Sequence, residues 1–309
     1  MWSWRSPATT ARCCPPSKRR VCARWASNLH RIWSRWPKKK GVESVARFFG
    51  RKCATELRTE CGPAALICAN NVLAHVPDLG GVLEGCRIAT EPEGVVSIEV
   101  PYLVHLLEGL EYDTIYHEHL CYFSVRALAD AFGRAGLAIF DIERLSVHGG
   151  SLRILARAGS RHAEVVDRMR QTERKKGLED LATYRAFAAA VAKNRTDLRR
   201  ILRELKHKGK RIAAYGAPAK GNTLLNYCGI GTDLVEYTVD RNPFKVGTFT
   251  PGMRLPVREV ALLLEDRPEI TLILPWNIAS EIIEQQKDYV EKGGQFLVPI
   301  PQPRVVGDR

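Results

Sequence analysis

The stretch GVVSIEVPYL, residues 94–103, guides the interpretation of the whole sequence, because it predicts a buried β-strand that follows a turn at residues 91–94. Upstream, AALICANNVLAHV (64–76) predicts a second buried strand that runs into a polar loop. Helix-forming sequence follows Pro77 and Asp78 and separates the two strands. The order strand, helix, strand is typical of an α/β sheet.

Downstream of this strand, the same alternation continues. SVRALADAFGRAGL (124–137) has apolar residues at helical spacing, with Ser124 as a candidate N-cap and Gly136 near its end. AIFDIERL (138–145) and GGSLRILARA (149–158) then predict two strands around a Gly-containing turn. These elements extend the first predicted sheet.

The C-terminal part predicts a second α/β unit. A chain of 309 residues is long enough for two domains, since single cores usually stop growing at about 250–300 residues. Residues 161–208 are charged, contain few Gly or Pro, and predict one or two long connecting helices. The strand and helix patterns after Gly209 are RIAAYGA (211–217), KGNTLLNYC (220–228), LVEYTVD (234–240), ITLILPW (270–276), NIASEIIEQQKDYVEKGG (277–294) and QFLVPI (295–300).

The charge and cysteine content exclude several classes of protein. The formal net charge is +13, but eleven of the Lys and Arg residues lie in residues 1–40, which contain no Asp or Glu, so the remainder is nearly neutral. We therefore expect no nucleic-acid partner. Nine cysteines without a C-x-x-C pair favour a reducing cytoplasm over a disulfide framework or zinc cage. No run approaches the roughly 18 apolar residues of a membrane span, so we expect no membrane partner. We further expect a cytoplasmic monomer.

Residues 1–42 predict an aberrant basic segment. They hold five of the six tryptophans and show no helical or strand period. Met and Trp have one codon each, and the codons of Met1 to Trp4 permit a Val-rich strand in a neighbouring reading frame. The same offset permits VVVEIASNDG and, further on, LGIEPA, and it rejoins the written frame at residues 38–40. We interpret the segment as frame-shifted; the alternatives are a disordered basic tail and a mitochondrial-type presequence.

The stretch YHEHLCYFS (116–124) is the first candidate site. Its polar residues follow a strand, and open α/β sheets bind ligands at the carboxyl ends of their strands. His119 is a candidate general base because an imidazole is partly neutral at pH 7, and Glu118 is placed to orient it. If the stretch is helical, Tyr116 and His119 share a face. The alternatives are a solvated loop and a metal site, for which His117 and His119 lack further ligands.

Two further segments carry candidate residues. His75 follows the strand in 64–76 and is expected to project toward the same cleft, although a structural histidine is the alternative. YGAPAKGNT (215–223) joins a strand to a helix, so its N–H groups and Lys220 are candidates for binding phosphate. It departs from G-x-G-x-x-G, but Asp240 ends the next strand as a ribose-binding acid would. A nicotinamide site is therefore an alternative.

With these segments, the chain resembles the C-methyltransferases that act on nucleotide-linked deoxysugars. This resemblance rests on NNVLAHVPDL, DTIYHEHLCYFSVRAL, LSVHGGSLRI, YGAPAKGNTLLNYCGIG, TPGMRLPV and LPWNIASEI, in this order. The family has an N-terminal zinc module, a central methyl-donor domain and a C-terminal Rossmann-like domain. The zinc module is absent here, so we expect no metal. The implied fold is α/β: an incomplete class I methyltransferase Rossmann-like sheet, a helical connector and a second Rossmann-like domain. The expected domains are 1–42 (aberrant), 43–145 (methyl donor) and 146–309 (C-terminal), the last divided into a connector at 161–208 and a Rossmann-like part at 209–309.

The resemblance also implies a reaction and a set of site residues. S-adenosyl-L-methionine would be the cofactor, and the substrate a nucleotide sugar that is methylated on the carbon beside its keto group. The implied roles are His119 as base, with Tyr116, Glu118 and His75 around the sugar; Asn71, Lys220, Tyr215, Gly216 and Asn222 in substrate binding; and Asn70 in cofactor binding. Because the main donor loops belong to the shifted frame, we expect the written chain to bind the cofactor weakly. The alternatives are an NAD(P)-linked oxidoreductase that uses residues 211–240 and a non-catalytic remnant.

Overall fold

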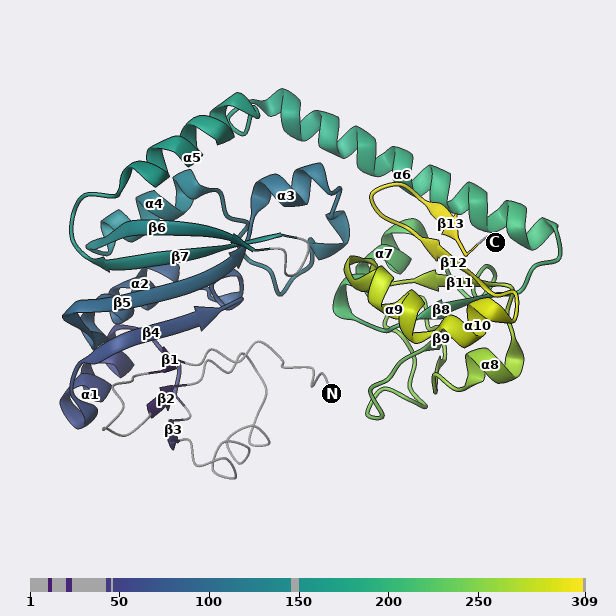
Figure 1. The fold of residues 1–309 in the computed structure, drawn as a ribbon, viewed down its shortest axis with the longest axis horizontal. Coiled ribbons are helices and arrows are strands. Elements are labelled where there is room, and N and C mark those ends of the chain that lie inside the picture. The colour runs from purple at the N-terminus through teal and green to yellow at the C-terminus, as the bar shows by residue number, and fades with distance from the viewer. Residues whose placement is uncertain (1–10, 13–20, 24–42, 46, 146–149, 308–309) are drawn as a thin grey trace. The chain divides into compact units, whose positions relative to one another are not determined.

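The computed structural model describes two units of mixed α/β structure (Figure 1). Apart from the predicted frame-shifted segment, the described residues are 43–45, 47–145 and 150–307. That segment, residues 1–42, lies outside the described residues except for two short strands, at 11–12 and 21–23. Residue contacts assign Met1–His105 and His117–Glu179 to the first unit, and Leu106–Tyr116 and Asp180–Arg309 to the second. The boundary that we expect at residue 146 stays a prediction.

The first unit contains a four-stranded sheet and four α-helices of at least ten residues among its described residues. Its elements are β1 (Ala11–Arg12), β2 (Val21–Ala23), β3 (Glu43–Val45), α1 (Arg51–Cys61), β4 (Ala64–Asn70), η2 (Leu73–His75), α2 (Leu79–Ala89), β5 (Thr90–Pro101), α4 (Val125–Arg134), β6 (Leu137–Leu145), β7 (Ser151–Ala158) and α5 (Glu164–Lys175), while α3 (Leu103–Glu108) leads into the second unit. The strand order of the larger sheet is β4-β5-β7-β6. β4 and β5 are parallel, whereas β7 is antiparallel to both β5 and β6. β1, β2 and β3 form a separate small sheet.

The two faces of β5 have different environments. Val96, Ile98 and Val100 belong to one buried apolar cluster, together with residues of α1, α2, α4 and α5. Glu99, on the other face, pairs with Arg153 of β7 at 2.6 Å, and Arg153 also pairs with Glu143 of β6 at 2.8 Å. This alternation is the period-2 pattern of a strand with one apolar face.

Our prediction of a turn at residues 91–94 is wrong, because these residues belong to β5. The pairing of β4 with β5 jumps from Ala64↔Thr90 to Leu66↔Val95, so the extra residues form an irregularity inside the strand. A Cβ atom at Gly94 would lie 2.8 Å from the carbonyl oxygen of Ala64. A bulged strand and a turn share this Gly- and Pro-containing signature, and only the pairing distinguishes them.

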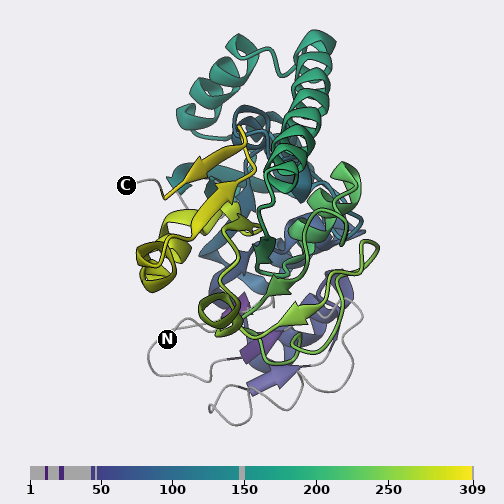
Figure 2. The same cartoon turned by 90° about the vertical axis from the view of Figure 1, so that its right-hand side faces the viewer.

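The second unit contains a six-stranded sheet in the order β10-β9-β8-β11-β12-β13, in which all neighbouring strands are parallel except β12 and β13. Figure 1 labels these strands, and Figure 2 shows the same segments, coloured green to yellow, from another side. The chain passes from β8 outward to β9 and β10 on one side and then continues with β11, β12 and β13 on the other side. The strand order therefore reverses between β8 and β11. Its elements are η3 (Tyr112–Thr114), α6 (Leu181–His207), β8 (Ile212–Tyr215), α7 (Ala219–Cys228), β9 (Thr238–Val239), β10 (Val257–Arg258), α8 (Leu262–Asp266), β11 (Ile270–Ile273), η5 (Trp276–Ile278), α9 (Ala279–Gln285), α10 (Lys287–Glu291), β12 (Gln295–Val298) and β13 (Arg304–Val306).

Both faces of this second sheet are covered. Ile212 and Ala214 of β8 join one apolar cluster with α6 and α7, whereas Ala213 and Tyr215 join a second cluster with α8, α9 and α10. Strands buried on both faces read as continuous apolar runs, as IAAY (212–215) and LIL (272–274) do here. The prediction of an α/β fold with long connecting helices, α5 and α6, is confirmed.

Candidate functional site

The loop at residues 117–123 crosses the carboxyl ends of β4 and β5. The N–H of Leu103, just after β5, donates to the carbonyl of Phe123 at 2.9 Å. The N–H of Leu120 donates to the carbonyl of Ala74, just after β4, at 2.7 Å. The loop is a turn followed by irregular chain, not a helix, so the i, i+3 relation considered for Tyr116 and His119 does not apply.

Two histidines meet at this edge of the sheet. The ring centroids of His75 and His119 lie 4.9 Å apart, with the ring planes inclined at 58°. His75 Nδ1 lies 2.7 Å from the carbonyl oxygen of Glu118. A carbonyl oxygen only accepts, so Nδ1 carries a proton, and in the neutral ring the Nε2 of His75 is the basic nitrogen. His75 is therefore oriented by the main chain of the loop that bears His119.

The remaining residues of the loop are less enclosed. The Glu118 side chain is exposed, and it is the backbone of Glu118 that orients His75. His117 is also exposed, whereas Tyr116 and His119 are half-buried. Tyr122, which the sequence interpretation missed, places its ring 6.2 Å from that of His119 in an edge-on arrangement. No periodicity signals Tyr122, because the loop has none.

Two side chains fix the point at which the loop enters α4. Ser124 accepts a hydrogen bond from the N–H of Ala127 at 3.1 Å, which confirms the predicted N-cap. Glu173 of α5 is buried, and its carboxylate accepts hydrogen bonds from the N–H groups of Val125 and Arg126 at 2.5 and 3.1 Å. A carboxylate at a helix N-terminus satisfies free N–H groups and the helix dipole together.

Asn70 and Asn71 lie at the carboxyl end of β4. Asn71 has a φ of 54°, in the left-handed region that Asn tolerates, and its N–H donates to the carbonyl of Glu99 at 2.8 Å. The Oδ1 atom of Asn71 is buried and accepts no hydrogen bond from the described residues. Such an acceptor fits a ligand that carries an N–H or O–H donor, as the ammonium group of S-adenosyl-L-methionine does. Asn70 is exposed.

In the second unit, the predicted loop at 215–223 joins β8 to α7. Gly216 has a φ of 86°, and a Cβ atom there would lie 2.7 Å from Cδ of Pro275. A Cβ atom at Gly221 would lie 2.9 Å from Cβ of Leu274. These glycines allow the end of β8 and the start of α7 to approach the segment after β11. Pro275 thus packs where the strand order reverses, the position at which dinucleotides bind in related sheets.

Lys220 does not point freely toward solvent. Its Nζ donates to Oδ1 of Asn277 and lies 4.3 Å from the centre of the Trp276 ring. The Trp276 Nε1–H donates to Oδ2 of Asp113 at 2.6 Å. Burial lowers the pKa of Lys220, while the nearby acids Asp113 and Glu111 oppose that change. The sequence interpretation missed both acids and Trp276.

The other predicted residues of this unit differ in their surroundings. Tyr215 is buried in an apolar cluster, and burial raises the pKa of its hydroxyl. Asn222 has a buried Oδ1 that accepts no hydrogen bond from the described residues. Asp240 accepts hydrogen bonds from the N–H groups of Ala217 and Asn242 at 2.7 and 2.8 Å, so its oxygens already close the loop. This arrangement favours a structural role for Asp240 over ribose binding.

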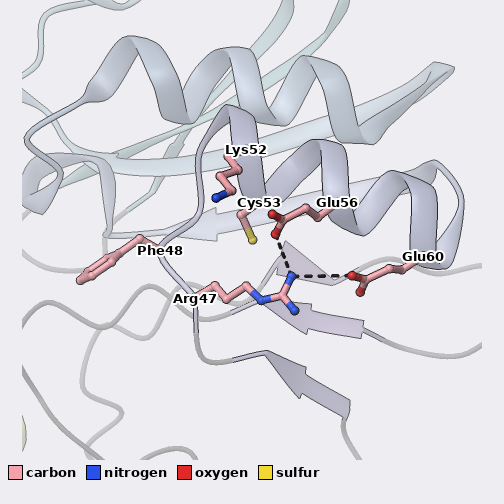
Figure 3. A pocket seen from close by; sticks show the side chains of 6 residues that line it. All are labelled: Arg47, Phe48, Lys52, Cys53, Glu56 and Glu60. Carbon is pink, nitrogen blue, oxygen red and sulfur yellow. Dashed lines mark hydrogen bonds and ion pairs between the residues drawn. The ribbon is translucent and has the colours of Figure 1, made fainter.

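A hollow of about 550 Å³ lies beside α1 and contains none of the predicted site residues (Figure 3). Arg47 reaches across it to Glu56 at 2.8 Å and to Glu60 at 3.7 Å. Elsewhere, the described part of the chain has no group of three or more His, Cys, Asp or Glu residues suited to a metal ion. It also has no helix that is long and apolar enough to span a membrane.

Two family models and a known protein match parts of this sequence. A family model described as the C-methyltransferase C-terminal domain matches residues 146–301, and one described as a methyltransferase domain matches residues 16–142. The C-methyltransferase NovU of Streptomyces niveus is 38% identical over 270 residues, which are 86% of this chain and 64% of NovU. The chain therefore spans less than two thirds of the length of that relative.

Solved structures give weaker likenesses. LepI, in a complex with SAM, is 17% identical over 38% of this chain and 31% of its own, with a TM-score of 0.31. TnmH is 27% identical over 31% of this chain and 30% of its own, with a TM-score of 0.24. The family assignment rests instead on the model that matches residues 146–301, half of the chain. The chain therefore belongs to the C-methyltransferase family.

Proposed function

We propose that this protein is an S-adenosyl-L-methionine-dependent C-methyltransferase that acts on the carbon beside the keto group of a nucleotide-linked deoxysugar. The observation that carries the proposal is the meeting of His75 and His119 at the carboxyl ends of two parallel strands. The centroids of their rings lie 4.9 Å apart. The membership of the family supports the reaction class.

His119 is the proposed base. A ketone acidifies the hydrogen on the neighbouring carbon, and a neutral imidazole at position 119 takes this proton as the C–H bond breaks. The electron pair then moves onto the ketone oxygen. Tyr116 is the better donor to that oxygen, since the Nδ1 proton of His75 is held by Glu118 and a neutral His75 has no proton on Nε2. S-adenosyl-L-methionine, held on the side of Asn70 and Asn71, would supply an electrophilic methyl group: the bond to the deprotonated carbon would form as the S–CH₃ bond breaks, and S-adenosylhomocysteine would leave.

Each unit has its own proposed ligand-binding residues. Asn71, with its unpartnered Oδ1, and the exposed Asn70 contribute to the methyl-donor side. Lys220, Tyr215, Gly216 and Asn222 contribute to binding of the nucleotide sugar, with Asn222 Oδ1 as the open acceptor. The substrate is thus a small molecule, without a nucleic-acid or membrane partner, and we propose that the protein works as a cytoplasmic monomer. The near-neutral charge of the chain after residue 40 supports this reading.

Deuterium exchange into the substrate tests the base without the methyl donor. The full chain is incubated in D₂O with a nucleoside-diphosphate-linked 4-keto deoxysugar, and the loss of the signal of the hydrogen beside the ketone is followed by NMR. His119→Ala should slow this exchange by about 10²- to 10⁴-fold. His117→Ala, two residues away and exposed, is the matched control and should exchange at the parent rate. Equal rates for His119→Ala and the parent would assign the base elsewhere.

A further inference from the structure

The segment Leu106–Tyr116, called here the inserted segment, belongs to the second unit although its flanks on both sides belong to the first. Leu110 and Tyr112 lie in an apolar cluster of the second unit. The Tyr112 hydroxyl donates to Oδ1 of Asn194 on α6 at 2.9 Å, and Asn194 Nδ2 in turn donates to the carbonyl of Pro299 at 2.9 Å. The inserted segment is therefore held by the core of the second unit.

A charged cluster holds the end of this segment that precedes the loop at residues 117–123, called here the imidazole loop. Asp113 is fully buried, and the Trp276 indole supplies its one side-chain hydrogen bond among the described residues. Lys220 stacks on the face of the same indole. Trp276 thus lies between a carboxylate at its N–H edge and an ammonium group on its face, where cation–π attraction operates. It follows β11, and Lys220 lies in the first turn of the helix after β8, so the cluster lies where the strand order reverses.

A purely structural anchor would not need these charges. Burial raises the pKa of Glu111 to about 7 and that of Asp113 to about 6, because both carboxylates lose solvation. Buried charged groups stabilise a fold poorly compared with apolar residues of similar size. The inserted segment already has apolar anchors in Leu110 and Tyr112. The charged cluster therefore suggests a positioning role.

We propose that Asp113 and Trp276 are positioning residues, whose hydrogen bond ties the inserted segment to the edge of the second sheet at which the strand order reverses and so holds the chain at Tyr116, one residue before the loop that carries His119. Tyr116 is the last residue of the inserted segment, and His117 is the next residue of the chain. A nucleotide sugar that binds beside Lys220 would act on the Trp276 indole and, through Asp113, on the inserted segment. The inference rests on the proposed function only for the identity of that ligand.

Amide hydrogen exchange of the full chain, followed by mass spectrometry, tests the mechanical link. Trp276→Phe keeps an aromatic ring but removes the N–H donor to Asp113. It should raise the exchange of amides in residues 111–120 by about tenfold or more, on both sides of Tyr116. The matched control is Tyr289→Phe, which removes a buried hydroxyl that donates to the carbonyl of Pro268 at 2.7 Å in the other apolar cluster of the same unit.

Tyr289→Phe should leave residues 117–120 at the parent rate. Unchanged exchange of these residues in Trp276→Phe, or an equal rise in Tyr289→Phe, would refute the link. Asp113→Asn keeps an oxygen that accepts from the indole and should retain the protection, whereas Asp113→Ala should behave like Trp276→Phe. The NMR signal of the Trp276 indole N–H, assigned by its loss in Trp276→Phe, should move in Asp113→Ala and little in Asp113→Asn. If Asp113→Asn loses protection as Asp113→Ala does, the hydrogen bond is not the device.

The exchange of deuterium into the sugar separates this inference from the proposed function. Trp276→Phe should lower the maximal rate of sugar exchange by about tenfold with a smaller change in the substrate concentration at half-maximal rate. If the parent chain exchanges no sugar hydrogen, the proposed function fails, while the amide exchange still decides the link. If the parent exchanges it and Trp276→Phe does so at the same rate, the proposed function stands and the positioning role fails.

Discussion

Replacing Glu173 by alanine should loosen the start of α4 and with it the end of the imidazole loop. Glu173 is 3% exposed, and its carboxylate accepts from the N–H groups of Val125 and Arg126, the first two residues of the helix. The alternative cap, Ser124, is already used by the N–H of Ala127. The variant therefore leaves two N–H groups without their partner.

The size of the effect follows from the surroundings of the two bonds. A hydrogen bond to a charged group contributes about 1.5–3 kcal/mol. The bond from Val125 is buried and should count almost fully, whereas water can replace most of the bond from the Arg126 N–H, which is only partly buried. The sum is about 2–4 kcal/mol, which corresponds to a fall of about 30- to 1,000-fold in protection of the α4 amides, since 1.4 kcal/mol is a factor of ten.

Amide exchange of residues 125–134 in the full chain measures this fall. Glu164→Gln, on the same helix but with a side chain that is 92% exposed, is the control and should change the protection less than about threefold. Glu173→Gln keeps one acceptor and should fall between the control and Glu173→Ala. If Glu173→Ala protects α4 as well as Glu164→Gln does, the reasoning that a buried carboxylate holds this helix start is refuted.

Three further outcomes are expected. Gly216→Ala should destabilise the second unit by at least about 2 kcal/mol, because residue 216 has a φ of 86° and its new Cβ atom would lie 2.7 Å from Cδ of Pro275. Thermal unfolding measures this loss of stability, and an unchanged midpoint would contradict it. The second unit should lose stability as pH rises from about 4 to about 7 and level off above, because Glu111, with a pKa near 7, and Asp113, with one near 6, stay protonated in the native state at pH values where the unfolded chain has released these protons. Glu111→Gln should remove part of this fall in urea titrations at pH 5 and 8, and a variant with the parent pH dependence would argue against it. Calorimetry should show weak or no binding of S-adenosyl-L-methionine by the chain as written, since the expected donor loops belong to the shifted frame; micromolar binding would disprove that interpretation.

Local sequence patterns predicted most elements of the fold, because their signals lie within a few residues. The N-cap at Ser124, the buried strand β11 and the long helices α5 and α6 all follow from neighbouring residues. Strand β9 is shorter than LVEYTVD suggests, and the helix expected at 277–294 is divided into η5, α9 and α10. Such boundaries depend on which hydrogen bonds the rest of the fold offers.

The sequence by itself determined the fold class, the place of the imidazole loop after a strand, and His75 and His119 as its candidate residues. Only the tertiary structure decided how these residues are held. His75 meets the carbonyl of Glu118 across 43 residues, Glu173 reaches Val125 across 48, and Trp276 reaches Asp113 across 163. Periodicity and capping report on the chain within one or two turns, whereas a buried polar group takes whichever partner the packed elements bring to it. The orientation of the site is therefore a property of the packing, which no single stretch of this sequence contains.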